Sequence, residues 1–494
     1  MPRNSLFDRA FFRMLFSLPK KKRKDFAAFI TLRQFNSSAG LVGLLELILK
    51  KYDPSKAKAS ADLDLLGKDS GMAVTTLEKS LSQLLSLLND FVLVRAALEA
   101  KDRLHALPFE SWVQEDLPED LLDREYRRRL RSLHRLPVKD AHLHEELLLE
   151  HSRAKLEAVK PRKDQGKLFD RHLELLDAFY LVARLRYACA AANAARIFRQ
   201  GDPKGHSVDL TEAQLSGLPP VGQAYRQLLG LLQDDEPTES RIREVLEFLG
   251  QHEGQFDLED RSDLFGYLLN TGFRGMVTGR AVFNDIVYEI YNALLDNGLL
   301  IAEGPLKGSH FKNIVTVMVR TRRLEEGRTF IGEYAPRLEP EERDLLTPYC
   351  LGIIEFHSGN FRETIGQFTQ LIQHAPDDQF WSLEARSVLW KAYFEAIETL
   401  DAREHEEMLR LYHSFRNFVA RNKQISEDHR SSYQNFIRLF NRLIQLTESN
   451  DSSDKLQGLE ALLEKAESME RVINKEWVKA TIRKKMALIR SENQ

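Results

Sequence analysis

One stretch of this chain, Leu345 to Asp378, has a spacing of small and aromatic residues that permits few folds. The spacing suits two antiparallel helices joined by a tight turn. Gly352 leaves room for the second helix to approach the first, Gly359 and the asparagine after it form the turn, and Phe361 begins the second helix. This part of the chain is therefore predicted to be a helical hairpin.

The second half of the stretch continues the same pattern. Phe368 fills the slot four residues after the small position, held by Thr364, and Pro376 closes the unit. This arrangement fits the 34-residue tetratricopeptide repeat. Three signature positions depart from it, the tryptophan, the tyrosine and the second small residue, which are here Pro348, Glu355 and Leu371. A single repeat cannot bury its own face, so the chain is predicted to be all-α, with tetratricopeptide-like helical hairpins stacked as a solenoid.

A second, degenerate repeat can be aligned upstream of the first. Placing Leu324 at the position of Phe361 puts Gly327 at the small position and Ile331 at the aromatic one. The spacing agrees with the repeat, although the residues alone do not identify it. Downstream, Leu389 lies where another repeat could begin.

Length and composition bound the remaining possibilities. The 494 residues exceed one ordinary core, so two or three units or an elongated solenoid are expected. The formal net charge of −3 argues against a protein dedicated to nucleic acid or to an anionic membrane. Only Cys189 and Cys350 are present, which fits a reducing compartment. Charged residues interrupt the N-terminus, unlike a signal peptide, and no run of 18 apolar residues predicts a transmembrane helix, so a cytoplasmic location is expected.

Breaks in the helical periodicity predict the organisation of the chain. Residues 201–220 are the strongest candidate for a major boundary, and residues 447–454 are predicted to be a flexible linker. The predicted parts are a basic N-terminal helical module at 1–110, a long-helix segment at 111–205, tetratricopeptide-like repeats at 221–446 and a C-terminal helix or helix pair at 455–494.

The long-helix segment contains a clear apolar stripe. Phe169, Leu173, Leu176, Tyr180, Ala183 and Tyr187 recur at steps of four and three, which places them on one face of a helix. Charged residues such as Asp177 and Arg184 stand between them and define the solvated side. We therefore expect the apolar stripe to face the core.

The repeat alignment also predicts a binding surface. In tetratricopeptide proteins the first helix of each repeat lines the concave face, and in the matched repeat this places Tyr349, Ile353 and Phe356 there. Such an apolar groove would bind a helix or a hydrophobic peptide, unless the protein's own neighbouring or C-terminal helix covers it. The upstream repeat places Lys312, Asn313 and Arg320 on the same face, where two cations and an amide could hold a peptide carboxylate. Solvated surface charge is the commoner explanation for such residues.

The predicted function is a non-catalytic cytoplasmic adaptor that binds a protein or peptide partner through these six residues, with no cofactor, no metal and no membrane. The alternative is a nucleic-acid-binding or regulatory protein that uses the basic N-terminal module, where Lys20 to Lys24 and interleaved phenylalanines could contact phosphates and bases. Those phenylalanines fall largely at helical spacing, which favours core positions. Partner identity and oligomeric state do not follow from the sequence.

Searches for catalytic or metal-binding motifs give little. His142, His144 and His151 occur together with glutamates, but Leu148 stands where an HExxH zinc motif would need its second histidine. No phosphate-binding loop and no nucleophile elbow is present. An enzyme of unrecognised type would need a polar pocket assembled from distant residues.

The wider pattern resembles an uncharacterised family of all-helical proteins from Bacteroidota. The resemblance covers nearly the whole chain and is carried by several segments: LPKKKRKDFAAFITLRQFN, LDAFYLVARLRYACAAANAARIF, the repeat described above, FRNFVARNKQISEDHRSSYQNFIRLF and INKEWV. It implies an all-helical fold and a bacterial origin, and no activity. The basic run at Lys20–Lys24 is stronger than this family's opening would lead us to expect.

Overall fold

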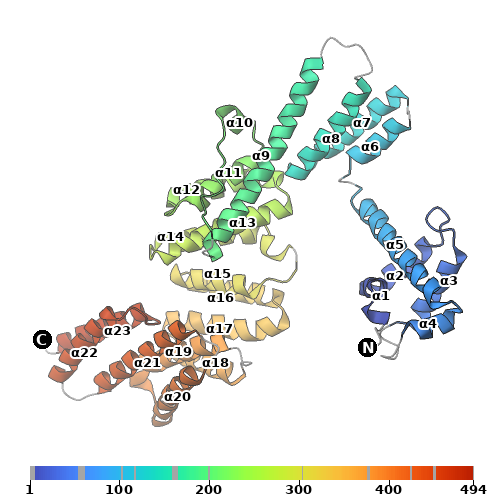
Figure 1. The fold of residues 1–494 in the computed structure, drawn as a ribbon. Helices are drawn as coiled ribbons and strands as arrows, with labels where there is room; N and C mark the ends of the chain where they lie inside the picture. Colours follow the sequence, from blue (N-terminus) through green and yellow to red (C-terminus); the bar gives the residue numbers. More distant parts are fainter. Residues whose placement is uncertain are drawn as a thin grey trace. The chain divides into compact units, whose positions relative to one another are not determined.

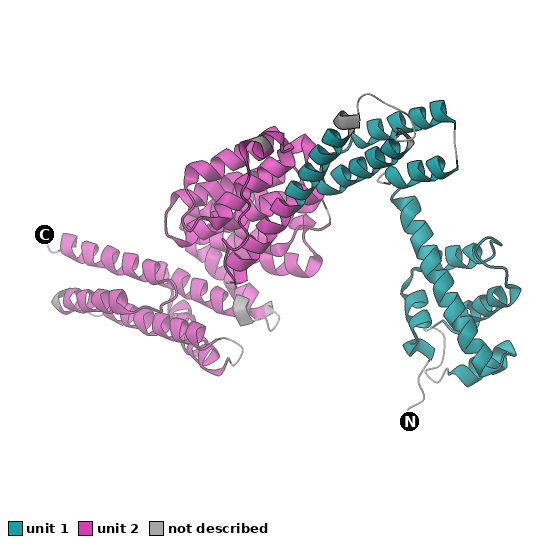
Figure 2. Ribbon diagram, turned by 45° about the horizontal axis from the view of Figure 1, so that its top comes forward, with its two compact units in different colours: residues 1–183 teal, residues 184–494 magenta. Residues whose placement is uncertain are grey.

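The protein is all-helical in the computed structural model, and the described residues contain no β-strand (Figure 1). The structure describes residues 6–53, 62–101, 104–115, 118–157, 165–198, 201–302, 304–374, 379–422, 426–448 and 452–492. Two compact units, residues 1–183 and 184–494, divide the chain within helix α9 (Figure 2). The predicted boundary at 201–220 instead falls inside the second unit.

The first unit begins with two separate cores. Leu44, Leu84 and Phe91 belong to a core formed by the first five α-helices, while Phe109 and Leu149 belong to a smaller one formed by the next three. The helices are η1 (Leu6–Asp8), α1 (Ala10–Ser17), α2 (Lys20–Phe29), α3 (Ala39–Lys51), α4 (Leu63–Ser70), α5 (Val74–Glu99), α6 (Ala106–Gln114), α7 (Glu119–Leu133), α8 (Asp140–Glu157) and α9 (Gln165–Phe198), which continues into the second unit.

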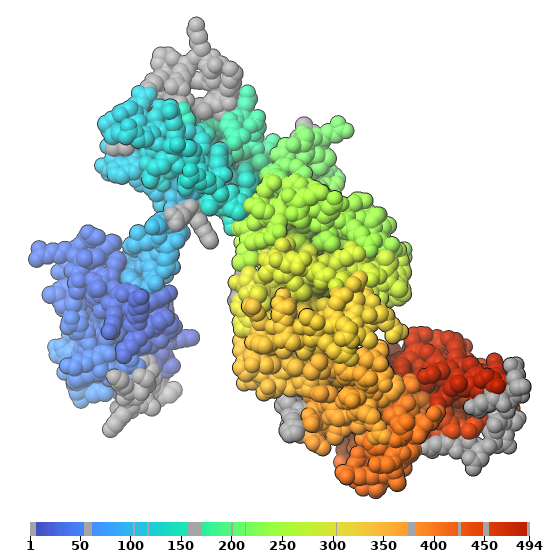
Figure 3. All heavy atoms as spheres, turned by 180° about the vertical axis from the view of Figure 1, so that it is seen from behind, coloured from blue at the N-terminus to red at the C-terminus, as the bar shows by residue number. Residues whose placement is uncertain are grey.

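The second unit is a succession of helices in which each packs mainly on its neighbours in sequence, as the adjoining colour bands of Figure 3 show. Its helices are α10 (Glu212–Gly217), α11 (Pro220–Gln233), α12 (Glu239–Gln251), η2 (Glu253–Gln255), α13 (Leu258–Val277), α14 (Val282–Asp296), η3 (Leu299–Ile301), α15 (Gly308–Arg320), α16 (Leu324–Tyr334), η4 (Ala335–Arg337), α17 (Pro340–Ser358), α18 (Phe361–His374), α19 (Gln379–Glu395), η5 (Ile397–Thr399), α20 (Ala402–Arg421), α21 (Glu427–Glu448), α22 (Ser452–Ser468) and α23 (Lys475–Glu492).

The hairpin predicted from the glycine and aromatic spacing is present as α17 and α18. Gly359 has a left-handed φ of 83° at the turn, and α18 begins at Phe361 as expected. A Cβ on Gly352 would lie 2.7 Å from the ring of Phe368, so only glycine allows this approach between the helices. Pro376, which was predicted to close the unit, lies outside the described residues. The C-terminal segment is the helix pair α22 and α23.

The expectation for the apolar stripe of α9 is wrong in its direction. The helix is present, but Phe169, Tyr180 and Tyr187 are exposed, while Leu181 and Leu185, on another face, are buried. The helix is apolar on two faces, and the periodicity of one face cannot tell which of the two meets the core.

One helix of the first unit has the length and composition of a membrane span. The helix α5 reaches a mean hydropathy of 1.4 over 18 residues. One face of α5 contributes Leu77, Leu84 and Phe91 to the N-terminal core. The expectation that the chain has no transmembrane helix stays a prediction.

Candidate functional site: a basic pocket between α15, α17 and α19

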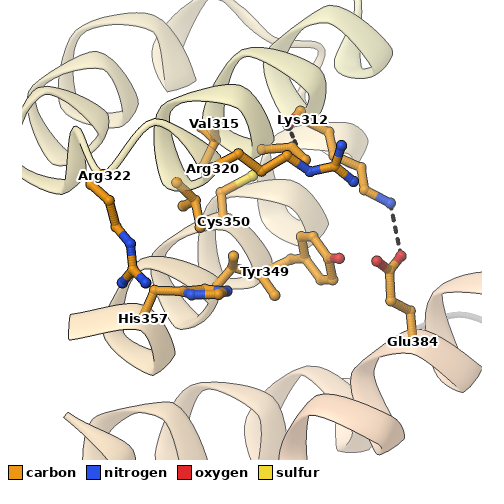
Figure 4. Close-up of a pocket in the computed structure, with 11 residues that line it drawn as sticks. Lys312, Val315, Arg320, Arg322, Tyr349, Cys350, His357 and Glu384 are labelled. Carbon is orange, nitrogen blue, oxygen red and sulfur yellow. Dashed lines mark hydrogen bonds and ion pairs between the residues drawn. The ribbon is translucent and has the colours of Figure 1, made fainter. Parts of the chain in front are cut away.

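A pocket of about 300 Å³ opens in the second unit where α15 and α17 lie side by side and α19 closes one end (Figure 4). Its lining combines an apolar floor with several cationic side chains. The lining residues are Lys312, Val315, Thr316, Val319, Arg320, Arg322, Tyr349, Cys350, Ile353, His357 and Glu384.

Small residues bring the walls of the pocket together. A Cβ on Gly308, at the start of α15, would lie 2.6 Å from Leu346 of α17, and one on Gly327 of α16 would lie 2.9 Å from Ile354. Both glycines therefore allow close helix packing that a larger residue would prevent. Gly327 is the small residue of the upstream alignment, so the sequence pattern correctly located this close approach.

Four of the six residues predicted to bind a partner line this pocket: Lys312, Arg320, Tyr349 and Ile353. Asn313 does not, because its side chain hydrogen-bonds to the hydroxyl of Tyr291 on α14.

Phe356, predicted as an apolar anchor, is buried and covered by the protein's own side chains. The Nζ atom of Lys391 lies 5.2 Å from the centre of the Phe356 ring and 5.5 Å from the ring of Trp477 on α23. Lys391 of α19 therefore lies over the Phe356 ring, and Trp477 of the C-terminal helix packs on the same ammonium group.

An internal ion pair occupies one end of the pocket. Lys312 Nζ lies 2.8 Å from Glu384 Oε2 and 5.1 Å from the centre of the Tyr349 ring. Burial, followed by the negative charge and hydrogen bond of Glu384, raises the pKa of Tyr349, so its hydroxyl stays protonated at neutral pH. Lys312 is therefore already compensated at this end.

The remaining cations of the pocket have no such compensation. Within the described part of the chain, the guanidinium groups of Arg320 and Arg322 form no hydrogen bond or ion pair. Figure 4 shows Arg322 beside His357, at the end away from Glu384, and Arg320 reaching across the pocket from α15. Partial burial, and then the charges of Lys391 and Arg322, lower the pKa of His357, so its ring is neutral at neutral pH. The pocket therefore offers two guanidinium groups, at separate places along it, and an uncharged imidazole; each arginine can hold an anionic group there.

The backbone of Arg322 is strained. Its φ is 62°, a left-handed conformation that costs a non-glycine residue roughly 1–2 kcal/mol. The N–H of Arg322 donates to the carbonyl of Val319, and the N–H of Arg323 donates to that of Met318, which is a Schellman ending for α15. The turn after α17 has the same two bonds and uses Gly359 at the equivalent position. The left-handed backbone fits glycine better than arginine, which motivates the hypothesis that the Arg322 side chain has a functional role.

We expect the Arg322→Gly variant to be more stable than the natural chain by roughly 1 kcal/mol, because glycine adopts the left-handed backbone freely. The same variant should bind anions less well in the pocket. Denaturant unfolding measures the first effect. Gly359→Ala is the matched control and should lose a similar amount of stability at the same position of the other turn; a loss of stability in Arg322→Gly would contradict the assignment of strain.

Sequence reasoning missed two of the charged residues that line the pocket, Arg322 and Glu384. Glu384 stands 34 residues after Cys350, so extending the repeat period by one full step would have found it. Arg322 lies in the turn after α15, outside the helical positions that the repeat pattern considers, and only its backbone conformation marks it.

The other sequence candidates are not assembled into sites. Among the described residues no group of three or more histidine, cysteine or carboxylate side chains is placed to hold a metal ion. His144 packs on the ring of Phe179 at 5.2 Å, and His151 lies near His172.

In the N-terminal module the phenylalanines are largely structural. Phe11, Phe12, Phe26 and Phe29 are buried, and Phe35 stacks on Phe29 at 4.3 Å. Lys20, Lys21 and Lys24 remain on the exposed face of α2. These buried rings are not available to stack on bases and give no support to the nucleic-acid interpretation.

Comparison with known proteins adds no assignment: no protein-family model, no curated protein and no solved structure matches this chain.

Proposed function

We propose that the protein is a non-catalytic adaptor that binds a protein or peptide partner in the basic pocket between α15, α17 and α19. The hairpins α15–α16 and α17–α18 would act as tetratricopeptide-like repeats of a solenoid. The observation that carries this proposal is that Arg320 and Arg322 line one pocket together with an apolar floor of Val315, Val319 and Ile353.

This combination selects a particular ligand chemistry. The arginines would bind a carboxylate, from an acidic side chain or a free C-terminus, through charge-assisted hydrogen bonds. The apolar floor would take up a neighbouring aliphatic or aromatic side chain. We accordingly propose a peptide segment that presents a carboxylate next to an apolar residue.

A cytoplasmic location and membership of the Bacteroidota family named above remain part of the proposal. They rest on composition and on sequence segments, whereas the ligand chemistry rests on the geometry of the pocket. The nucleic-acid alternative has less support, because the N-terminal phenylalanines are largely buried.

The test is a selection from a library of displayed peptides, both with free and with amidated C-termini, using the full chain. We expect enrichment of apolar peptides that carry a carboxylate, and at least a tenfold loss of affinity in the double variant Arg320→Glu, Arg322→Glu, because charge-assisted hydrogen bonds contribute about 1.5–3 kcal/mol each. The control is Arg403→Glu, Arg410→Glu, which makes the same charge change at two exposed positions of α20. Equal affinities of the two double variants would contradict the proposal.

A further inference from the structure

The helix α9 presents an apolar stripe that the fold leaves uncovered. Five large side chains on this stripe are between 46% and 70% exposed: Phe169, Leu173, Leu176, Tyr180 and Tyr187. The helix is held in the fold by other residues, among them Leu175, Leu181, Val182, Leu185 and Cys189, which are buried. The stripe is therefore not needed to hold α9 in place. Exposed apolar surface of this extent on a well-packed helix marks an interaction surface.

The stripe has the spacing of a coiled-coil seam. Its positions alternate in steps of four and three without interruption through 169, 173, 176, 180, 183, 187, 190, 194 and 197. The last of these is Ile197, which is exposed, and the alanines at 183, 190 and 194 are half-buried. A 3–4 repeat sustained over four heptads predicts pairing with another helix along a seam of about 40 Å.

The seam is complementary to itself when two copies run antiparallel. In such a pair the a positions face the d positions of the other helix. Centring the pair on Tyr180 against Ala183 of the second copy also sets Leu173 against its Ala190 and Phe169 against its Ala194. Large side chains meet small ones in these three layers, and Leu176 meets Tyr187 of the second copy in the layer between Leu173 and Tyr180. A parallel pair would set tyrosine against tyrosine and alanine against alanine.

The charges beside the seam agree with the same arrangement. Asp177 and Arg184 are both exposed and stand seven residues apart, at the same heptad position. In the antiparallel register Asp177 of one copy lies within reach of Arg184 of the other, and the two-fold symmetry makes this contact twice. The residues flanking the seam thus favour a second copy as the occupant.

From this seam we infer that α9 pairs with α9 of a second copy in an antiparallel two-stranded coiled coil, so that the protein is a homodimer. This inference is independent of the proposed ligand pocket. The stripe is exposed in the single chain, so substitutions on it leave the fold of the chain intact and report on association.

Sedimentation equilibrium of the full chain, from about 1 to 100 µM, tests the inference. The natural chain should have twice the 57.1 kDa mass of one copy at the upper concentrations, and Tyr180→Lys should raise the dissociation constant at least a hundredfold. The control is Leu93→Lys, which removes a leucine that is 68% exposed on α5 and should leave the dimer unchanged. A monomer at 100 µM would overturn the inference and leave the stripe to a different helix.

A charge exchange tests the orientation. Asp177→Arg and Arg184→Asp should each raise the dissociation constant about tenfold, because like charges then face each other across the seam. An equimolar mixture of the two variants should dimerise as tightly as the natural chain, since each copy supplies the charge that the other needs. A mixture as weak as either variant alone would exclude the antiparallel pair.

Discussion

Gly275→Ala is expected to destabilise the second unit by about 3 kcal/mol, a typical upper value for overpacking a tight core. Gly275 lies on α13 against the ring of Phe283, which is the second residue of α14 and is 1% exposed. A Cβ at position 275 would fall within 2.5 Å of Phe283 Cγ and closer still to other atoms of the ring. The ring is enclosed, so α13 and α14 would have to separate. Denaturant unfolding, followed by circular dichroism, measures the loss.

The same helix supplies the control. Gly266 is also in α13, and a Cβ built there meets nothing within 4 Å. Gly266→Ala should therefore stabilise the protein by roughly 0.5–1 kcal/mol through the better helix propensity of alanine. If Gly275→Ala lowers the free energy of unfolding and Gly266→Ala raises it, the packing between α13 and α14 decides the result, because both variants make the same chemical change. Equal effects of the two would contradict it.

The second large effect is expected from Lys391, a buried amine in α19. Its side chain is 8% exposed, and its Nζ atom lies 3.4 Å from Asn474 Oδ1. Burial lowers the pKa of Lys391 from 10.5 to about 8, although the charges of Glu384 and Glu395 act to raise it. Below pH 8 the folded protein therefore carries a charged lysine in a poorly solvated place.

The lowered pKa of Lys391 determines whether the protein becomes more or less stable as the pH rises. The folded pKa is below the unfolded one, so the stabilisation is fully present above about pH 10.5 and is lost as the pH falls through about 8. Relative to the Lys391→Met variant, the natural chain should gain roughly 3 kcal/mol of unfolding free energy, mostly between pH 8 and 10.5. Groups that both proteins share, such as the tyrosines, cancel in this difference.

Unfolding in denaturant at pH 7, 8, 9 and 10.5 measures the difference in unfolding free energy between the natural chain and each variant. The control is Lys465→Met on α22, whose exposed lysine should give a difference that is small and flat over the same range. If the Lys391 difference is equally flat, the buried amine carries no desolvation cost and the account of this site is wrong.

Packing within a single helical hairpin was the part of the fold that could best be predicted from the sequence. The roles of Gly352 and Phe368 follow from sterics within one hairpin, because a missing side chain permits a close approach that its neighbour then fills. The pocket was partly predictable for the same reason: residues at matched positions of adjacent hairpins come to lie side by side, as Lys312 and Tyr349 do.

The sequence could not show which face of a helix is buried, or which helices beyond its immediate neighbour cover it. The stripe containing Phe169 and Tyr180 has the periodicity of a core face, yet a second apolar face of α9 is the one buried. Phe356 has the position of a groove residue, but Lys391 of α19 lies over its ring, and Trp477 of α23, much later in the chain, packs on the same ammonium group. Both outcomes depend on contacts that no local pattern encodes.

The central claim is that the pocket between α15 and α17 receives the partner, and site-specific photocrosslinking tests it most directly. A photoreactive amino acid would replace Ile353, which lines the pocket, or Leu409, an exposed residue of α20, in cells of the source organism. We predict that one protein is crosslinked at position 353, that it is absent at position 409, and that the double variant Arg320→Glu, Arg322→Glu abolishes the product. A product of equal yield at both positions, or one insensitive to the two arginines, would contradict the account.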